Sequence, residues 1–356
     1  MNLEDFGFNA EQETYRRENY PGDFEIGRVT AEHKERYIVR TAEKELEAEI
    51  TGNLRFTAKS REDFPAVGDW VALTVYDEDF AIIQQVLPRF SVLKRQTAGQ
   101  SVDVQLIAAN IDYALIMQSV DRDFNINRLE RYLTICYAAK VNPVIVLSKT
   151  DLLPPEEVHG LQEKIRTRIG NAPVLAISSE THEGYAELLS FIRKGKTYCL
   201  LGSSGVGKST LINHLSGKNI METGSISTNT GKGRHITSHR ELFVLENGGI
   251  LIDNPGMREV GMADHAGGLE AAFGAIARLA DHCRYKDCTH VHEAGCSVIE
   301  AVEKGELNRA SYENYLKLER EKTWFETSAR ERKRTEKIFG RIIKDYSKKD
   351  VKGKKF

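Results

Sequence analysis

A glycine-rich segment near the middle of the chain has the residues of a phosphate-binding loop. Residues Gly202 to Ser209 match the pattern G-x-x-x-x-G-K-[ST], with a predicted strand at 197–201 before them and a predicted helix at 210–215 after them. The glycines let backbone N–H groups surround phosphate oxygens, the helix N-terminus adds partial positive charge, and Lys208 can reach the β and γ phosphates of a nucleotide. The expected phosphate contacts are Gly202, Ser203, Ser204, Gly205, Val206, Gly207, Lys208, Ser209 and Thr210.

Residues beside this loop have the chemistry of a magnesium site. The Ser209 hydroxyl is suited to Mg²⁺, and Asp253 ends an apolar predicted strand with Gly256 three residues further on. In a nucleoside triphosphatase an Asp at this place holds the Mg²⁺ shell, and the glycine offers its N–H to the γ-phosphate. The polar, basic segment "NTGKGRHITSHREL" lies between the two motifs. It supplies Thr237 as a further magnesium ligand and catalytic-loop residue, with Ser238 as the alternative.

A candidate base-reading site precedes the phosphate loop in the chain. The segment after Gly256 offers no motif of the N-K-x-D type, whereas two upstream apolar runs end in polar residues. Asp151, as a carboxylate, can accept hydrogen bonds from N1–H and N2–H of guanine, which adenine lacks. Lys149 would lay its aliphatic stem along the ring, and Ser179 stands where a backbone N–H meets the guanine oxygen. The expected guanine contacts are Ser148, Lys149, Thr150, Asp151, Ser178 and Ser179.

Three of the five cysteines lie close together and suggest a metal site. An odd number of cysteines in a long chain favours metal binding in a reducing compartment over a disulfide framework. Three thiolates and one imidazole form a tetrahedral set that Zn²⁺ accepts, with no position left open for chemistry, so the zinc would be structural. His282 and His292 are competing imidazoles. The candidate zinc ligands are Cys283, Cys288, His290 and Cys296.

The elements around these motifs predict a multidomain protein. Short β-type runs from 24 to 92 indicate an N-terminal β-barrel of about five strands, a size that suits the oligonucleotide-binding (OB) fold. Beyond Gly99, apolar strands alternate with amphipathic helices, which predicts a central α/β domain, and a mostly helical C-terminal domain follows the cysteines. The expected boundaries are an N-terminal extension at 1–22, the barrel at 23–95, the α/β domain at 96–278, the zinc-binding domain at 279–328 and a basic helical or disordered tail at 329–356.

The charge of the chain is unevenly distributed. The net charge is −2, but residues 329–356 hold 12 Lys and Arg against four Asp and Glu, so the remainder carries −10. A basic end of this kind is built to meet a polyanion such as RNA. No window approaches the roughly 18 apolar residues of a membrane span, and the polar N-terminus has no signal-peptide pattern. We therefore expect a cytoplasmic protein with no membrane partner.

Together the motifs resemble a known family, the ribosome small-subunit-dependent GTPases, which are circularly permuted. The matching stretches, which extend over nearly the whole chain, are "PAVGDWVAL", "VLPRFSVLKR", "FNINRLERYL", "GSSGVGKSTLIN", "GKGRH", "DNPGM" and "CRYKDCTHVHEAGC". The resemblance implies a GTP hydrolase that acts in late maturation of the small ribosomal subunit, binds ribosomal RNA through the barrel and zinc domains, and is stimulated by the subunit. It also selects His290 over the competing imidazoles as the zinc ligand.

The chain departs from the family pattern at several positions. Ser148 replaces the usual Asn, which weakens one contact to the base edge and loop, and Ile236 replaces a usual threonine, which leaves Thr237 as the magnesium ligand. Ser179 replaces a customary alanine. Met257 follows the D-x-x-G glycine, where many small GTPases have a water-orienting Gln, so we expect His235 in the polar segment to be the catalytic group. We predict slow intrinsic turnover that the subunit accelerates.

The sequence thus predicts a monomeric GTPase that binds GTP and GDP, Mg²⁺ with the nucleotide, one structural Zn²⁺, and the small ribosomal subunit with its RNA. It leaves two alternatives open. One is an RNA-binding assembly scaffold with little nucleotide turnover, and the other is an ATP-driven enzyme. Because the segment after Gly256 runs directly into the zinc domain, we also expect nucleotide state to shift that domain relative to the barrel.

Overall fold

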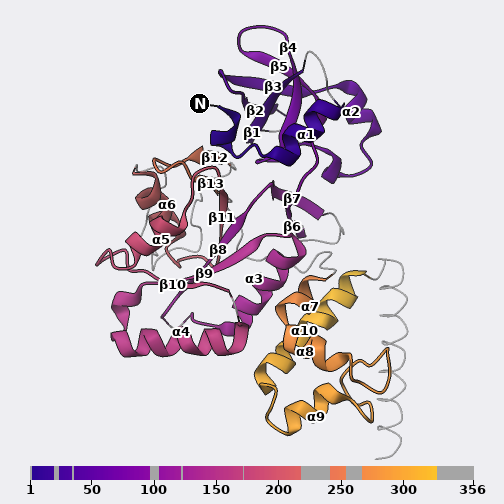
Figure 1. Cartoon of the computed structure of the whole chain (residues 1–356), viewed down its shortest axis with the longest axis vertical. Coiled ribbons are helices and arrows are strands. Elements are labelled where there is room, and N and C mark those ends of the chain that lie inside the picture. The colour runs from indigo at the N-terminus through magenta and orange to yellow at the C-terminus, as the bar shows by residue number, and fades with distance from the viewer. Residues whose placement is uncertain are drawn as a thin grey trace, which may run out of the picture.

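A computed structural model shows a barrel, a central α/β unit and a group of C-terminal helices (Figure 1). The structure describes residues 2–19, 24–33, 36–96, 104–121, 123–170, 172–217, 241–253 and 267–326. Within those ranges no helix combines the length and the apolar character that a membrane span needs.

The barrel is a closed ring of five strands. Strand β1 pairs with both β2 and β4, and β3 pairs with β5, which gives the cyclic order β1-β2-β3-β5-β4. Apolar residues alternate along these strands and fill the ring, with Val29, Leu46 and Ile83 fully buried. The predicted barrel is therefore confirmed. Its strands are β1 (Glu25–His33), β2 (Arg36–Arg40), β3 (Glu45–Ile50), β4 (Trp70–Val75) and β5 (Phe80–Val86), with the short helices α2 (Gly52–Thr57) and η2 (Arg61–Asp63) between β3 and β4.

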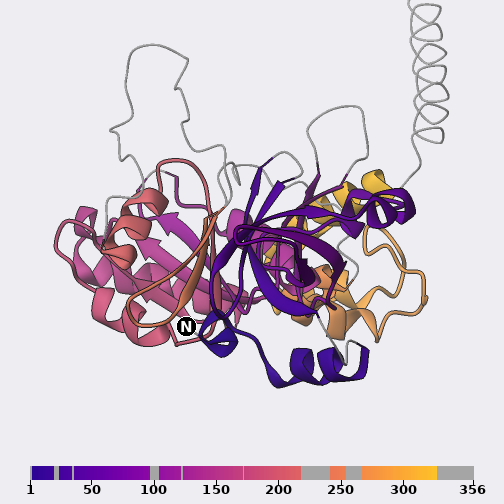
Figure 2. The ribbon, with the colours of Figure 1, turned by 90° about the horizontal axis from the view of Figure 1, so that it is seen from above.

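The N-terminal segment packs on the outside of the barrel (Figures 1 and 2). It consists of the 3-10 helix η1 (Leu3–Phe6) and helix α1 (Ala10–Asn19). Phe8 lies edge-on against Trp70 of β4, with ring centroids 4.7 Å apart. Arg28 of β1, which is 1% exposed, donates to backbone carbonyls of the N-terminal segment, the barrel and the α/β unit. This buried guanidinium therefore ties three parts of the chain together.

A hairpin that the sequence interpretation did not foresee joins the barrel to the α/β unit. Strands β6 (Val92–Gln96) and β7 (Val104–Ala109) form a separate antiparallel two-stranded sheet. Leu93 and Ile107 of this hairpin belong to the core of the α/β unit. The first strand of the hairpin crosses the domain boundary that we predicted between residues 95 and 96. That domain boundary stays a prediction.

The α/β unit is built on six strands in the order β10-β9-β8-β11-β13-β12, of which only β12 is antiparallel to its neighbour. Strand β11 follows β10 in the chain but lies beside β8 in the middle of the sheet. Strands β8, β9 and β10 therefore extend the sheet from its centre in one direction, and β11, β13 and β12 extend it in the other. Such a reversal marks the point where parallel α/β sheets bind ligands. The strands are β8 (Tyr113–Ser119), β9 (Asn142–Ser148), β10 (Val174–Ala176), β11 (Thr197–Leu201), β12 (Glu241–Val244) and β13 (Ile250–Asp253).

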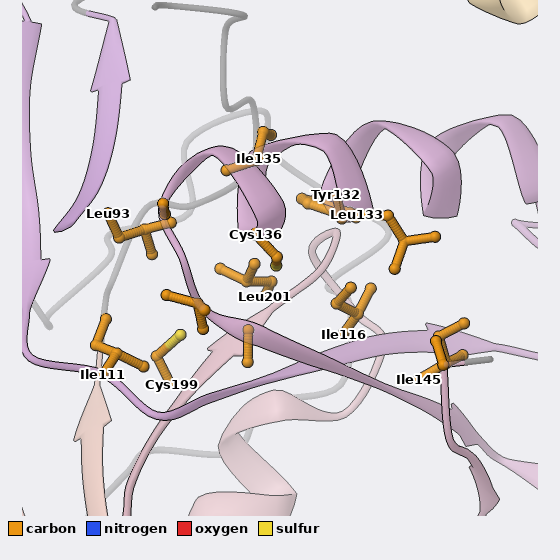
Figure 3. Packing of buried hydrophobic residues seen from close by; sticks show 14 of the residues in the cluster. Leu93, Ile111, Ile116, Tyr132, Leu133, Ile135, Cys136, Ile145, Cys199 and Leu201 are labelled. Carbon is orange, nitrogen blue, oxygen red and sulfur yellow. The ribbon is translucent and has the colours of Figure 1, made fainter. Parts of the chain in front are cut away.

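Helices cover both faces of this sheet, as the alternation of apolar strands and amphipathic helices predicted. On one face α3 packs its apolar side on β8, β9 and β11, where Tyr132, Leu133 and Cys136 lie against strand residues (Figure 3). Each large apolar side chain buried here contributes about 2 kcal/mol. On the other face α5 and α6 form a second core with the same strands. The helices are α3 (Ile126–Ala138), η3 (Thr150–Leu152), α4 (Pro155–Ile169), α5 (Tyr185–Phe191) and α6 (Lys208–Ser216).

The C-terminal helices form their own apolar core and pack against α3. That core contains Leu269, Phe273 and Val298 together with Cys296. The approach to α3 is close, since a Cβ on Gly268 would lie 2.3 Å from the carbonyl oxygen of Thr134. The helices are α7 (Gly268–Ala272), α8 (Gly274–Ala280), α9 (Ser297–Glu303) and α10 (Arg309–Glu326).

Barrel and α/β unit share one continuous sheet. Ala31 of β1 pairs with Glu241 of β12, so 11 strands are joined by hydrogen bonds from β10 to β4. Strand β12 begins at Glu241, near the end of the polar segment in which the sequence places His235 and Thr237.

Candidate nucleotide site and metal centre

The predicted phosphate loop lies between β11 and α6, at the centre of the sheet. Gly202, Gly205 and Gly207 have φ values of 145°, 80° and 94°, which other residues rarely adopt. A Cβ on Gly202 would also lie 2.4 Å from the carbonyl oxygen of Met117 in β8. The glycines are thus needed for the path of the backbone. Their position at the switch between β8 and β11 is where a ligand is expected.

Lys208 begins α6 and folds back over the loop. Its Nζ donates to the carbonyl oxygens of Gly202, over 2.8 Å, and Ser203, over 2.5 Å. The ammonium group is therefore held inside the loop by two residues of the loop itself. The remaining predicted phosphate contacts between Ser204 and Thr210 form the turn and the first residues of the helix.

The predicted base-reading residues come together at the ends of β9 and β10. Lys149 has a left-handed backbone with φ of 60°, which turns the chain into the short helix η3. The Thr150 N–H donates to the carbonyl oxygen of Ile177, and the Ser178 hydroxyl donates to Asp151 Oδ1 over 2.6 Å. The last bond fixes the Asp151 carboxylate.

The turn formed by residues 148–151, named the base-reading turn after its predicted role, touches the phosphate loop. The Ser148 hydroxyl donates to the carbonyl oxygen of Val206 over 2.7 Å, across 58 residues of sequence, and Ser148 is 3% exposed. The replacement of Asn by Ser at this position therefore keeps a contact with the loop. The two motifs, distant and in reversed order along the chain, lie side by side in space.

Lys149 has a carboxylate partner. Its Nζ lies 3.0 Å from Asp121 Oδ2, beyond the end of β8. Burial acts to raise the pKa of Asp121, but hydrogen bonds from the Asp123 backbone, Lys149 and Ser119 outweigh it, and the pKa is lowered overall. The ionised Asp121 thus holds the lysine stem at the edge of the base-reading turn, a role that the sequence interpretation had missed.

A cavity of about 410 Å³ opens between the two motifs. Ser179 and Thr210 line it, together with Asn213, Gly217 and three aromatic side chains that no motif had singled out. The rings of His182 and His214 stack with centroids 5.3 Å apart, and Tyr185 lies 3.9 Å from His214. Burial, followed by the charge of His182, lowers the pKa of His214, which favours its neutral form.

Three predicted site residues lie outside the described residues, namely His235, Thr237 and Gly256. Asp253 is the last residue of β13, the strand next to β11. Its position at the same end of the sheet as the phosphate loop agrees with a role near Ser209, which is the second residue of α6.

Three cysteines and one histidine of the C-terminal helices converge. The ligand atoms of Cys283, Cys288, His290 and Cys296 all lie within 4.8 Å of one another. Cys283 Sγ is 3.6 Å from His290 Nδ1 and 3.8 Å from Cys296 Sγ, and His290 Nδ1 is 3.4 Å from Cys296 Sγ. Tetrahedral zinc with ordinary bond lengths requires edges of about 3.8 Å between sulfurs and about 3.6 Å between sulfur and nitrogen. The donor set therefore fits a zinc ion.

A braced loop presents His290 to this cluster. The histidine has φ of 59°, and its carbonyl oxygen accepts a 2.6 Å hydrogen bond from the Tyr312 hydroxyl of α10. The Glu293 carboxylate accepts from Thr289 and from the backbone N–H groups of residues 291 and 292. The hydrogen bond from the Thr289 hydroxyl to this carboxylate is the first cause of the strongly lowered pKa of Glu293. His282 and His292, which spacing alone had left as alternatives, are outside the cluster.

Comparison with known proteins places the chain in a family. The family model described as RsgA GTPase matches residues 86–263. The small ribosomal subunit biogenesis GTPase RsgA 1 of Oceanobacillus iheyensis is 40% identical over 348 residues, which cover 95% of this chain and 98% of that protein. The small ribosomal subunit biogenesis GTPase RsgA of Methanosarcina acetivorans is 42% identical over 84% of this chain and 80% of its own length.

Solved structures agree with the fold. The crystal structure of YjeQ from Thermotoga maritima superposes with a TM-score of 0.63 at 26% identity, and covers 85% of this chain and 99% of its own. YloQ, described as a circularly permuted GTPase, gives a TM-score of 0.62 at 23% identity over 87% of this chain and 99% of its own, which shows the shared fold alone. Because the family model matches residues 86–263 and relatives of about 40% identity extend along nearly its whole length, the chain belongs to the RsgA GTPase family.

Proposed function

We propose that this chain hydrolyses GTP in late maturation of the small ribosomal subunit, and that the subunit stimulates the reaction. The observation that carries the proposal is the contact between Ser148 of the base-reading turn and Val206 of the phosphate loop. Because this bond joins the two motifs, Asp151 and Lys208 can hold opposite ends of one nucleotide. The relatives named as small ribosomal subunit biogenesis GTPases indicate the process in which GTP hydrolysis is used.

Each predicted residue has a role in this site. The backbone of 202–210 surrounds the phosphates together with the N–H of Gly256, and Lys208 places its charge between the β and γ phosphates. Asp151 accepts from guanine N1–H and N2–H, with its carboxylate already oriented by Ser178. The stem of Lys149 covers the ring, and the backbone N–H of Ser179 meets the guanine oxygen. This assignment favours GTP over ATP, because adenine offers neither donor to Asp151.

Ser209, Thr237 and Asp253 would hold magnesium, which neutralises phosphate charge when it is bound with GTP. Met257 offers no group to orient a water molecule, so hydrolysis falls to His235, which positions the attacking water when the protein is bound to the subunit. Slow turnover without the subunit and fast turnover with it follow from this arrangement.

The C-terminal cluster holds one zinc ion in a structural role. The four protein ligands fill a tetrahedron, so no position remains open for chemistry. Zinc then stabilises the helices that follow it. We propose that this domain and the barrel bind ribosomal RNA, with the basic tail at 329–356 in contact with the phosphate backbone. The protein acts as a cytoplasmic monomer, since its partner is large.

The rate of GTP hydrolysis against added small ribosomal subunits, at several salt concentrations, tests this function. We expect a low basal rate, a strong increase with subunits, and loss of that increase as salt weakens the contacts with RNA phosphates. Binding to the subunit with no turnover above background would instead support an RNA-binding scaffold. Turnover of ATP at the rate of GTP would support the ATP-driven alternative.

A further inference from the structure

Arg128 of helix α3 contacts the phosphate loop. Arg128 stands in the first turn of α3, and its Nη1 donates to Ser203 Oγ over 2.7 Å. Asn125 caps the helix by accepting from the Arg128 backbone N–H, which fixes where the helix begins. Asp123 Oδ2 lies 3.5 Å from the same guanidinium. The arginine side chain is 32% exposed, so its charge is only partly screened by water.

Ser203 is thereby held from two sides. On the side of α3, Tyr132 lies one turn beyond Arg128 and its phenol shares a hydrogen bond with Ser203. Burial raises the pKa of this phenol, whereas the charge of Arg128 and the bond with Ser203 act to lower it. On the side of the loop, the Ser203 carbonyl oxygen accepts from Lys208 Nζ over 2.5 Å. Ser203 therefore connects the guanidinium of α3 to the lysine that reaches the β and γ phosphates.

Helix α3 is a rigid base for this contact. Tyr132, Leu133 and Cys136 are between 0 and 4% exposed, and they pack against the central strands (Figure 3). A helix anchored in this way cannot slide without disturbing the core. The position of Arg128 is thus set by the packing of the sheet, and the position of Ser203 follows from it.

We infer that Arg128 is a positioning residue of the GTPase reaction. It acts through Ser203 to keep Lys208 aligned with the phosphoryl group that is transferred. The inference rests on the proposed function and extends it to a helix outside the nucleotide motifs. Many backbone N–H groups share the binding of ground-state phosphates, so loss of Arg128 affects affinity little. A displaced Lys208, however, stabilises less of the charge that develops during transfer, and small displacements in such sites are costly.

The test compares steady-state GTP hydrolysis by the full chain and three variants. Arg128→Met keeps the aliphatic stem but removes every donor, and we expect kcat to fall about tenfold with KM changed less than about threefold. Arg128→Lys restores one charged donor and should recover part of kcat. Arg131→Met is the matched control, because Arg131 lies on the same helix but pairs with Glu321 of α10 over 2.6 Å. Its basal rate should stay within about twofold of the original chain.

A double variant decides whether the effect passes through Ser203. If it does, Arg128→Met combined with Ser203→Ala lowers kcat no further than Arg128→Met alone. Multiplicative losses would overturn the inference, as would equal losses in the Arg128 and Arg131 variants. If the original chain and Arg128→Met hydrolyse GTP at the same rate, this inference alone is overturned. An unaltered chain with no turnover, with and without subunits, overturns the proposed function and this inference with it.

Discussion

The Ser148 hydroxyl donates a 2.7 Å hydrogen bond to the carbonyl oxygen of Val206, and this bond joins the turn after β9 to the loop after β11. Both residues are buried, at 3% and 2% exposed. A buried acceptor that loses its donor costs about 1–3 kcal/mol, so this bond matters to the geometry of both motifs. The order of the motifs along the chain has no bearing on it.

We expect Ser148→Ala to weaken GTP binding about tenfold, because the Val206 carbonyl would lose its partner and the two loops would separate. Titration with a fluorescent GTP analogue measures the change. Ser190→Ala is the matched control, since that hydroxyl donates over 2.7 Å to Glu187 within α5 and connects no loops. Equal affinity in both variants would show that the contact between the loops does not shape the site.

Asp151→Asn should exchange guanine for xanthine. An amide at this position can donate to the second oxygen of xanthine, and it accepts less well from the two guanine donors. We expect xanthosine triphosphate to compete at least about a hundredfold better against GTP than it does for the original chain. Asp123→Asn, outside the base-reading turn, provides the comparison. An unaltered preference for GTP in the Asp151 variant would remove this residue from base recognition.

Glu130 of α3 holds the C-terminal helices through a buried network. Its carboxylate accepts from Arg168 of α4 over 2.8 Å and from Ser311 and Asn314 of α10 over 2.8 and 2.6 Å. We expect Glu130→Ala to lower the free energy of unfolding by about 3 kcal/mol, because the Arg168 guanidinium, which is 12% exposed, would lose its carboxylate and the Ser311 and Asn314 side chains would lose their acceptor.

Urea denaturation measures this loss against an exposed pair of similar geometry. Glu163 and Arg166 of α4 lie 2.6 Å apart with both side chains about half exposed, so Glu163→Ala should cost less than about 1 kcal/mol. Equal losses in the two variants would mean that the network at Glu130 adds nothing beyond a surface contact.

Removal of the metal should unfold the C-terminal cluster. A zinc assay is expected to find one ion in the original chain and none in Cys288→Ser, with proteolysis near 283–296 faster in the variant. His282→Ala and His292→Ala leave the four ligands in place and should keep the metal. Retention of zinc by Cys288→Ser, or its loss from His292→Ala, would show that the ligand set is different.

His235→Ala should lower the GTPase rate measured with small subunits by about a hundredfold, since general-base and water-positioning groups contribute at this scale. His239→Ala, four residues further along the same segment, serves as the control. A stimulated rate that does not change in His235→Ala would exclude this histidine from the mechanism.

Local patterns predicted much of this architecture because they follow from the nearest neighbours in the chain. The barrel strands and the α/β alternation each have a periodicity that is typical of one kind of element. The close spacing of Cys283, Cys288 and Cys296 indicated a cluster, although spacing alone left His282 and His292 as alternatives to His290. The hairpin of β6 and β7 was missed, since strand 104–109 is a short apolar run without clear alternation, and its partner strand resembles a continuation of the barrel.

Contacts between distant segments could not be read from such patterns. The sequence around Glu130 shows only that it is a polar residue on a predicted helix. Nothing in that sequence indicates Ser311 or Asn314 as its partners. The aromatic wall made by His182, Tyr185 and His214 likewise depends on how α5 and α6 lie beside each other. Both features required the folded chain.

The pairing of β1 with β12 changes what the α/β unit presents to its surroundings. Strand β12 would otherwise be the exposed margin of the sheet, with free N–H and C=O groups that invite association with other chains. Here the barrel covers part of that margin. A GTPase unit cut away from its barrel would therefore carry an unprotected edge that favours aggregation.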